Sequence, residues 1–168
     1  MKKILAFSII LFAFTAGAFA QSSATQQTIA TATIVGPLTL TKVNDMDFGT
    51  IAVSAAVGTV VLATDNTRSF SGGASVVPPA NGLAASFTVA GQASETFAIT
   101  LPDNGTVTLT GPGDAMPVSA FNHNAGANPA LNGTGTAAFT VGATLTTGAS
   151  QASGAYSSAN FPVTVSYN

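Results

Sequence analysis

The sequence of 168 residues contains no cysteine and no tryptophan, and only 6% of its residues are charged. Without cysteine there is no disulfide, no thiolate metal site and no lipid-bearing cysteine, so a secreted form of the chain must rely on its core or on partners. The charged fraction lies far below the roughly 25% of ordinary soluble domains. The polar surface must therefore consist mainly of threonine, serine, asparagine and glutamine.

Basic residues are especially scarce. The chain has four lysines and arginines, and two of them lie directly after Met1. The other two, Lys42 and Arg68, are outnumbered by six acidic residues and cannot form the basic patch that nucleic acid or an anionic membrane surface requires. We therefore expect no nucleic-acid partner. An uncharged β-protein surface is one interpretation, and an extracellular subunit packed against copies of itself is the other.

Residues for catalysis or metal binding are equally few. The single histidine, His123, lies in the loop-like sequence FNHNAG without a cysteine or carboxylate beside it, which is typical of a solvated side chain. Asp45 and Asp47 could offer oxygen ligands to calcium, but the EF-hand spacing is absent and a turn before Phe48 explains them better. No serine stands in a G-x-S-x-G elbow, and no glycine-rich segment has phosphate-loop spacing. We predict a non-enzymatic protein with no catalytic site, metal or cofactor.

The N-terminus has the order of a secretory signal peptide. A lysine pair is followed by an apolar run over residues 4–14 and by the small-residue pattern A-x-A that ends at Ala20. The run is shorter than the roughly 20 residues that span a bilayer. We expect a signal peptide helix over residues 1–20, a flexible segment over residues 21–29 and one domain over residues 30–168. The mature chain is expected to be secreted, to the periplasm, the outer surface or the extracellular space.

The rest of the chain has the pattern of short β-strands. Glycine and proline recur too often for long helices, and the mature part shows no convincing 3.6-residue apolar period. The turn signals separate about nine to eleven strands, which is typical of an antiparallel sandwich or barrel. Residues 85–90 and 136–147 alternate most cleanly, and both contain the sequence Phe-Thr-Val. We expect these two segments to be similar core strands.

Two shorter runs indicate a hairpin. Residues 95–101 place Phe97, Ile99 and Leu101 on one face, a turn that contains Asn104-Gly105 follows, and residues 107–109 return the chain. We predict that these two strands pair with each other.

The last residues of the chain carry a regular alternation. Phe161, Val163, Val165 and Tyr167 are separated by Pro162 and small polar residues, so they share one face of an extended strand. Pro162 lacks an N–H group and fits the start or the edge of a strand. Such a strand can close a sheet within its own chain or be offered to another chain, and the sequence leaves both open.

Several short blocks follow one another in a fixed order: Phe48-Gly49, FTVAG from Phe87, FAITLP from Phe97, Met116-Pro117-Val118, VGATL from Val141, GAY from Gly154 and the terminal FPVTVSYN. In this order the blocks resemble a bacterial secreted family catalogued as domain of unknown function 4402. The resemblance covers residues 30–168, and the family name carries no activity, so it implies a fold and not a function.

The end of the chain is also similar, more distantly, to chaperone–usher fimbrial subunits and to spore-coat-U-type domains. Gly154 lies 14 positions before the last residue, and Tyr167 is penultimate. This resemblance implies an immunoglobulin-like β-sandwich that lacks a strand, which a chaperone and then the N-terminal extension of another subunit supply. It also implies that Val163, Val165 and Tyr167 face the chaperone.

The same resemblance makes the N-terminal run the candidate donor strand. Residues 28–35 are β-prone and place Ala30, Ala32 and Ile34 on one face. The disulfide common in well-known fimbrial subunits is absent, and two alanines would fill a groove poorly. The segment can therefore also be the first strand of an all-β antiparallel sandwich that is complete by itself.

Two functions are compatible with these observations. The leading hypothesis is a secreted structural or adhesive surface subunit that assembles through β-strand addition, with copies of itself or other surface subunits and with a periplasmic chaperone as partners. The alternative is a self-complete sandwich that binds a ligand such as a surface glycan through loops, of which residues 122–132 are the favoured one.

Overall fold

The computed structural model describes residues 23–78 and 82–168, without the side chain of Val76. The signal-peptide prediction lies outside these residues. The chain divides into an N-terminal part that ends at Thr33 and a β-domain from Ile34 to Asn168. Residues 23–38 form no strand, so the expectation that residues 28–35 are the first strand of a self-complete sandwich is wrong, and their role as a donated strand stays a prediction. β-propensity alone does not make a strand, because a strand needs a neighbouring backbone.

The β-domain confirms the prediction of an all-β antiparallel sandwich. The described residues contain no helix, and so none that could cross a membrane. Every strand pairing is antiparallel. The described strands are β1 (Thr39–Asn44), β2 (Ile51–Leu62), β3 (Arg68–Val76), β4 (Ala85–Ala90), β5 (Phe97–Thr100), β6 (Val107–Leu109), β7 (Met116–His123), β8 (Thr136–Thr147) and β9 (Thr164–Tyr167).

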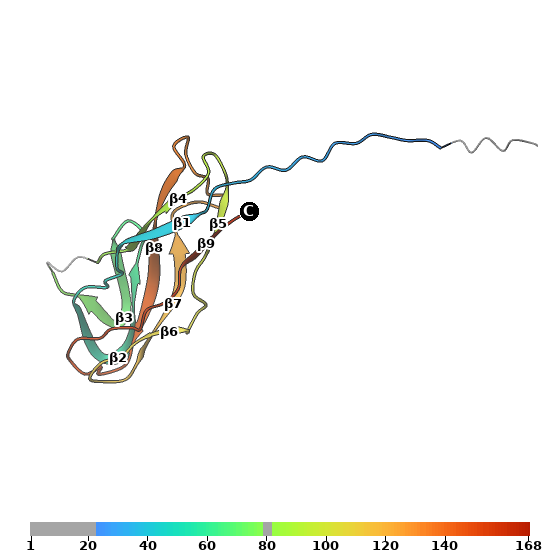
Figure 1. Cartoon of the computed structure of the whole chain (residues 1–168). Coiled ribbons are helices and arrows are strands. Elements are labelled where there is room, and N and C mark those ends of the chain that lie inside the picture. The colour runs from blue at the N-terminus through green and yellow to red at the C-terminus, as the bar shows by residue number, and fades with distance from the viewer. Residues whose placement is uncertain (1–22, 79–81) are drawn as a thin grey trace, which may run out of the picture. The chain divides into compact units, whose positions relative to one another are not determined.

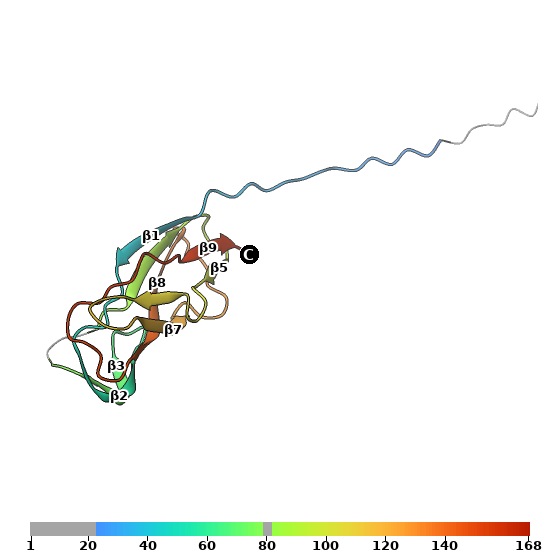
Figure 2. The same ribbon diagram turned by 90° about the horizontal axis from the view of Figure 1, so that it is seen from below.

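Two sheets form the sandwich (Figures 1 and 2). The larger sheet has the order β1-β4-β8-β2-β3, with β7 on β8 and β6 on β7, and the smaller sheet consists of β5 and β9. β8 is the strand that most others use: it pairs with β4 over residues 136–141, with β2 over residues 143–147 and with β7 along its other edge. Gly142 marks the change from β4 to β2, because a side chain there would collide with the backbone of Leu62.

β4 and β8 have the bounds and the buried faces that the alternation predicted. Phe87 and Phe139, from the two copies of Phe-Thr-Val, lie opposite each other across the ladder, and their ring centroids are 5.3 Å apart. Both side chains are buried. The two similar segments are therefore neighbours that contribute one stacked aromatic pair to the core.

The hairpin predicted over residues 95–109 is wrong. β5 pairs with β9 in the smaller sheet, whereas β6 pairs with β7 in the larger one. The turn itself is present, since Thr106 N donates to Asp103 O at 3.2 Å and Gly105 has a φ of 78°. It carries the chain from one sheet to the other, because Phe97 and Val107 are buried in different hydrophobic clusters.

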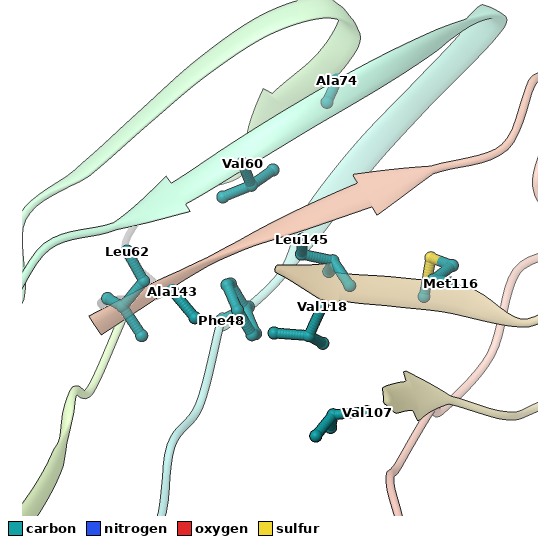
Figure 3. Close-up of a cluster of buried hydrophobic side chains, with 9 residues drawn as sticks. All are labelled: Phe48, Val60, Leu62, Ala74, Val107, Met116, Val118, Ala143 and Leu145. Atoms are coloured by element: carbon teal, nitrogen blue, oxygen red, sulfur yellow. The ribbon is translucent and has the colours of Figure 1, made fainter. Parts of the chain in front are cut away.

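Two hydrophobic clusters fill the domain. We call the first the closed core; the β5–β9 sheet packs against it, and it consists of Ala85, Phe87, Val89, Phe97, Leu131, Phe139 and Val141. We call the second the grooved core; Figure 3 shows its side chains on β2, β3, β6, β7 and β8 and on the segment before β2, and it consists of Phe48, Val60, Leu62, Ala74, Val107, Met116, Val118, Ala143 and Leu145.

Candidate functional site

The terminal strand closes a sheet within its own chain. β9 pairs with β5, and the predicted one-face alternation is confirmed, since Phe161, Val163, Val165 and Tyr167 are half-buried while the polar residues between them are exposed. Phe161 packs against the grooved core and the other three pack against the closed core. The side chains expected to meet a chaperone are therefore turned toward the protein's own core.

Tyr167 fastens this strand to two other segments. Its hydroxyl accepts a hydrogen bond from Gln92 N at 2.7 Å and donates one to Gly36 O at 3.1 Å. Gly91 provides the space, because a side chain at that position would collide with the Tyr167 hydroxyl. The penultimate tyrosine is thus an internal clamp in the folded chain.

Tyr156 is a second clamp, in the segment that precedes the terminal strand. Its hydroxyl accepts hydrogen bonds from Gly113 N at 2.8 Å and Gln151 Nε2 at 3.0 Å, and it donates one to Ala152 O at 2.9 Å. A side chain at Gly113 would lie 2.6 Å from this hydroxyl. The clamp therefore fastens residues 151–156 onto the turn that contains Gly113.

Gly154 allows this segment to approach the same turn. Its φ is 147°, a conformation that favours glycine, and a side chain would lie 2.5 Å from Pro112 Cγ. Ser157 then pairs with Thr110 through two backbone hydrogen bonds of 2.8 and 3.0 Å. The Gly-x-Tyr block of the sequence therefore docks the segment before β9 onto residues 110–113.

A groove of about 1070 Å³ opens beside the grooved core. One wall consists of residues 45–53, the connection from β1 together with the first three residues of β2, and the other consists of residues 151–161, which lead to β9. Its volume matches the upper end of the usual range for ligand pockets, roughly 300–1,000 Å³. The lining also includes buried apolar side chains of the larger sheet: Phe87, Val107, Met116, Val118 and Leu145.

Both walls contain backbone without a strand partner. In the described part of the chain, residues 158–163 make no backbone hydrogen bond, since pairing ends at Ser157 and resumes with β9. On the opposite wall, residues 51–53 pair with β3 on one side, while β8 reaches β2 only from Gly58 onward. Free donors and acceptors beside an apolar floor form the kind of site that an added β-strand fills.

Charged side chains are few in the groove lining. Lys42 Nζ donates to Asp45 Oδ1 at 2.5 Å, and both residues are exposed. Asp47 Oδ1 accepts from Gly49 N at 2.7 Å, and the Asp47 backbone pairs with Leu83, which agrees with a turn before Phe48. Among residues 23–78 and 82–168, no three histidine or acidic side chains gather into a metal site. The groove is therefore suited to a neutral occupant.

The remaining candidates lie elsewhere. His123 ends β7 and is half-buried, so the expectation of a solvated loop residue is wrong: its ring lies 6.2 Å from that of Phe139, and its Nδ1 accepts from Ala125 N at 3.3 Å. Ala30, Ala32 and Ile34 are exposed. Sequence reasoning missed the groove, because its walls lie about one hundred residues apart and no local pattern links them.

Comparison with known proteins gives one match. A family model described as Domain of unknown function (DUF4402) matches residues 38–167. No curated protein and no solved structure matches the chain. The matched region contains both walls of the groove and both tyrosine clamps, whereas Ala30, Ala32 and Ile34 lie before it.

Proposed function

The chain belongs to the DUF4402 family, whose description names no activity, and we propose its function from the geometry of the groove. The protein is a secreted, non-enzymatic structural or adhesive surface subunit, pilin-like, that assembles through β-strand addition. One observation carries this proposal: a groove of about 1070 Å³ lies beside the grooved core, between residues 158–163, which make no backbone hydrogen bond in the described part of the chain, and residues 51–53, which pair on one side only. Covering apolar surface and pairing free backbone groups both stabilise the complex with an added strand.

The N-terminal stretch has the chemistry of such a strand. Residues 23–35 contain no charged residue, which suits a groove with few charges. They form no strand of their own, and Ile34 is 94% exposed. In an extended conformation Ala30, Ala32 and Ile34 share one face and the threonines between them share the other. In the proposed assembly, the first face covers the groove floor of a second copy.

The terminal strand has a supporting role in this assembly. β9 pairs with β5 along one edge, and no described residue pairs with its other edge. Residues 158–163 continue this unpaired edge into the groove. A donated strand would lie against this edge, with Val163, Val165 and Tyr167 flanking it from within the folded chain. A periplasmic chaperone would occupy the same groove before assembly.

The test begins with protein sheared from its native cells. A denaturing gel of unheated and heated samples is compared with negative-stain microscopy of the same fraction. Strand-linked subunits give a ladder that collapses to one band on boiling, together with fibres. A single monomer band in both lanes, without fibres, would overturn the proposal, and the loop after β7 would then be screened against glycans.

Point variants in the N-terminal stretch locate the contact. Ala32→Asp places a carboxylate on the face that enters the groove, and it should abolish the ladder. Thr31→Asp places the same charge on the opposite face and is the matched control, since neighbouring residues of a strand point to opposite sides. Equal ladders from both variants would contradict insertion of this face.

A further inference from the structure

β3 ends the larger sheet with a free edge. It pairs with β2 along one side, and no backbone within residues 23–78 and 82–168 pairs with its other side. β3 has nine residues, which is more than β1, β5, β6 or β9, the other strands with a free edge. Unpaired N–H and C=O groups along such an edge are a template for a strand from another chain.

The β3 edge lacks the residues that usually protect an edge. Charged side chains and prolines block pairing between molecules. β1 carries Lys42, and β9 follows Pro162. From Ser69 to Ser75, β3 contains neither a charged residue nor a proline. Among the free edges, this one is the best suited to pair with an identical strand.

Phe70 shows where the sheet is incomplete. Phe70 and Val60 lie opposite each other in the β2–β3 ladder, and opposite residues of an antiparallel pair share a face. Val60 is 0% exposed in the grooved core, whereas Phe70 is 52% exposed. The apolar face of the sheet therefore continues beyond the last part that is covered. A strand added beside β3 would cover the Phe70 ring.

We propose that β3 pairs with β3 of a second copy of this chain, antiparallel, about a twofold axis at Phe70. Ser69-Phe70-Ser71 is a palindrome, so Phe70 of each copy lies opposite Phe70 of the other, and Ser69 lies opposite Ser71. Arg68 then lies opposite Gly72, and no like charges meet. Gly72, with a φ of 65°, ends the regular stretch and keeps the contact short.

This contact joins two larger sheets side by side and is independent of the groove. No residue of β3 belongs to the described groove lining. Because few residues pair, the association is weak in dilute solution and is expected to matter where copies are crowded on a surface. Two identical edges meet, so the interface closes as a dimer.

The absence of cysteine from the chain gives a direct test. Ser69→Cys and Ser71→Cys are made separately in the full chain, which leaves Phe70 in place. Opposite residues in an antiparallel pair have Cα atoms roughly 4.5–5.5 Å apart, within the range that a disulfide spans. Under mild oxidation, the mixture of the two variants should give several-fold more disulfide-linked dimer than either variant alone. Boiling without reductant preserves this dimer and collapses strand-linked ladders.

The control uses the same spacing on another edge. Thr41→Cys and Val43→Cys lie on β1, and their mixture measures crosslinking by random collision. A Ser69/Ser71 yield no higher than this control would overturn the proposal. Equal yields from the mixture and from Ser69→Cys alone would overturn the register at Phe70.

A second measurement leaves the serines unchanged. Sedimentation velocity of the wild-type chain should show a fraction of dimer that increases with concentration. Phe70→Leu should retain this dimer. Phe70→Lys should lose it, because two ammonium groups would lie opposite each other. Wild-type protein that stays monomeric up to millimolar concentration would overturn the proposal.

Discussion

The closed core and the grooved core share β8, yet a second sheet covers only one of them. The closed core packs against β5 and β9, so Phe97 is 0% exposed between two sheets. Beside the grooved core lie residues 45–53, which lead from β1 into the first residues of β2, and the irregular residues 151–161, with about 1070 Å³ of space between them and its side chains. Within the described residues, the single chain therefore covers one core with a second sheet and leaves a groove beside the other.

This difference separates two tasks within one domain. Closed-core side chains such as Val89, Phe97 and Phe139 are almost completely buried and do not line the groove, so their packing contributes to the stability of the monomer. Partly buried side chains such as Ile51 and Phe161 pack against the grooved core and line the groove, so part of their surface is available to another chain. Substitutions of the same type should therefore cost different amounts in the two cores.

Removing a large side chain from the closed core should have the largest effect. Phe97→Ala is expected to lower the free energy of unfolding by about 3–5 kcal/mol, because the cavity it leaves is enclosed. Met116→Ala, beside the groove, should cost about 2 kcal/mol, at the low end for this substitution. Urea denaturation measures both. Equal losses would mean that the two cores are packed alike.

Adding a methylene group to one side chain in the closed core and to one that lines the groove should also cost different amounts of stability. Val89→Leu, in the closed core, is expected to destabilise the protein by about 1–3 kcal/mol, because no space exists for the larger side chain. Val53 is half-buried and lines the groove, so Val53→Leu should cost less than about 1 kcal/mol. Thermal unfolding of the two variants checks this, and a larger loss for Val53→Leu would contradict the space assigned to the groove.

The two tyrosine clamps allow a matched comparison of smaller effects. Tyr156→Phe and Tyr167→Phe each remove a hydroxyl with at least two hydrogen bonds and should each lower stability by about 1 kcal/mol. Hydrogen exchange separates them: Tyr156→Phe should speed exchange in residues 151–157 of the groove wall, and Tyr167→Phe should speed it in β9. The same pattern from both variants would argue against separate clamps.

The smallest expected effect is on the stability of the folded chain at acidic pH. Thr67 Oγ1 donates to Asp65 Oδ1 at 2.6 Å, and this bond, with a second from Thr67 N, lowers the pKa of the Asp65 carboxyl below 3.8. A carboxyl with a lower pKa in the folded chain stabilises it above its unfolded pKa, and the contribution is lost as pH falls through the folded value. In Asp65→Asn, Tm should therefore decrease slightly less than in the wild type as the pH falls below about 4.

Control variants define the outcome of the acid titration. Asp103→Asn, in the turn before β6, is the comparison for a surface carboxyl. If Asp65→Asn and Asp103→Asn alter the acid transition equally, the hydrogen bonds from Thr67 have no measurable role in the β2–β3 turn.

The local sequence pattern predicted where the strands lie better than it predicted which strands pair with each other. The alternation in residues 85–90 and 136–147 gave β4 and β8, because burial of one face of a strand imposes a period of two. Residues 95–101 and 107–109 also alternate and are joined by a turn at Asp103, yet the hairpin predicted from them is wrong. Neither the alternation nor the turn shows which sheet a strand joins. Residues 28–35 have the composition of a strand, but no neighbouring backbone makes them one.

The site was harder to predict than the fold. Gly154, Tyr156 and Tyr167 stand out in the sequence as motif residues, but the sequence does not show what they contact. Their role is seen only in the hydrogen bonds of Tyr156 with Gly113 and of Tyr167 with Gly36, which join distant segments. The groove lies between two segments about one hundred residues apart in the chain, and no local sequence pattern indicates that they come together.

In the assembly proposed above, mechanical load would enter this domain through β1. Residues 23–38 form no strand, and β1 pairs with β4 from Thr39↔Ala90 to Asn44↔Ser86. Hydrogen bonds of an antiparallel ladder are perpendicular to the strands, so tension along β1 strains them together in shear instead of opening them one at a time. Without a disulfide in the chain, this ladder and the Tyr167 clamp on Gly36 set the force at which a tethered subunit would yield.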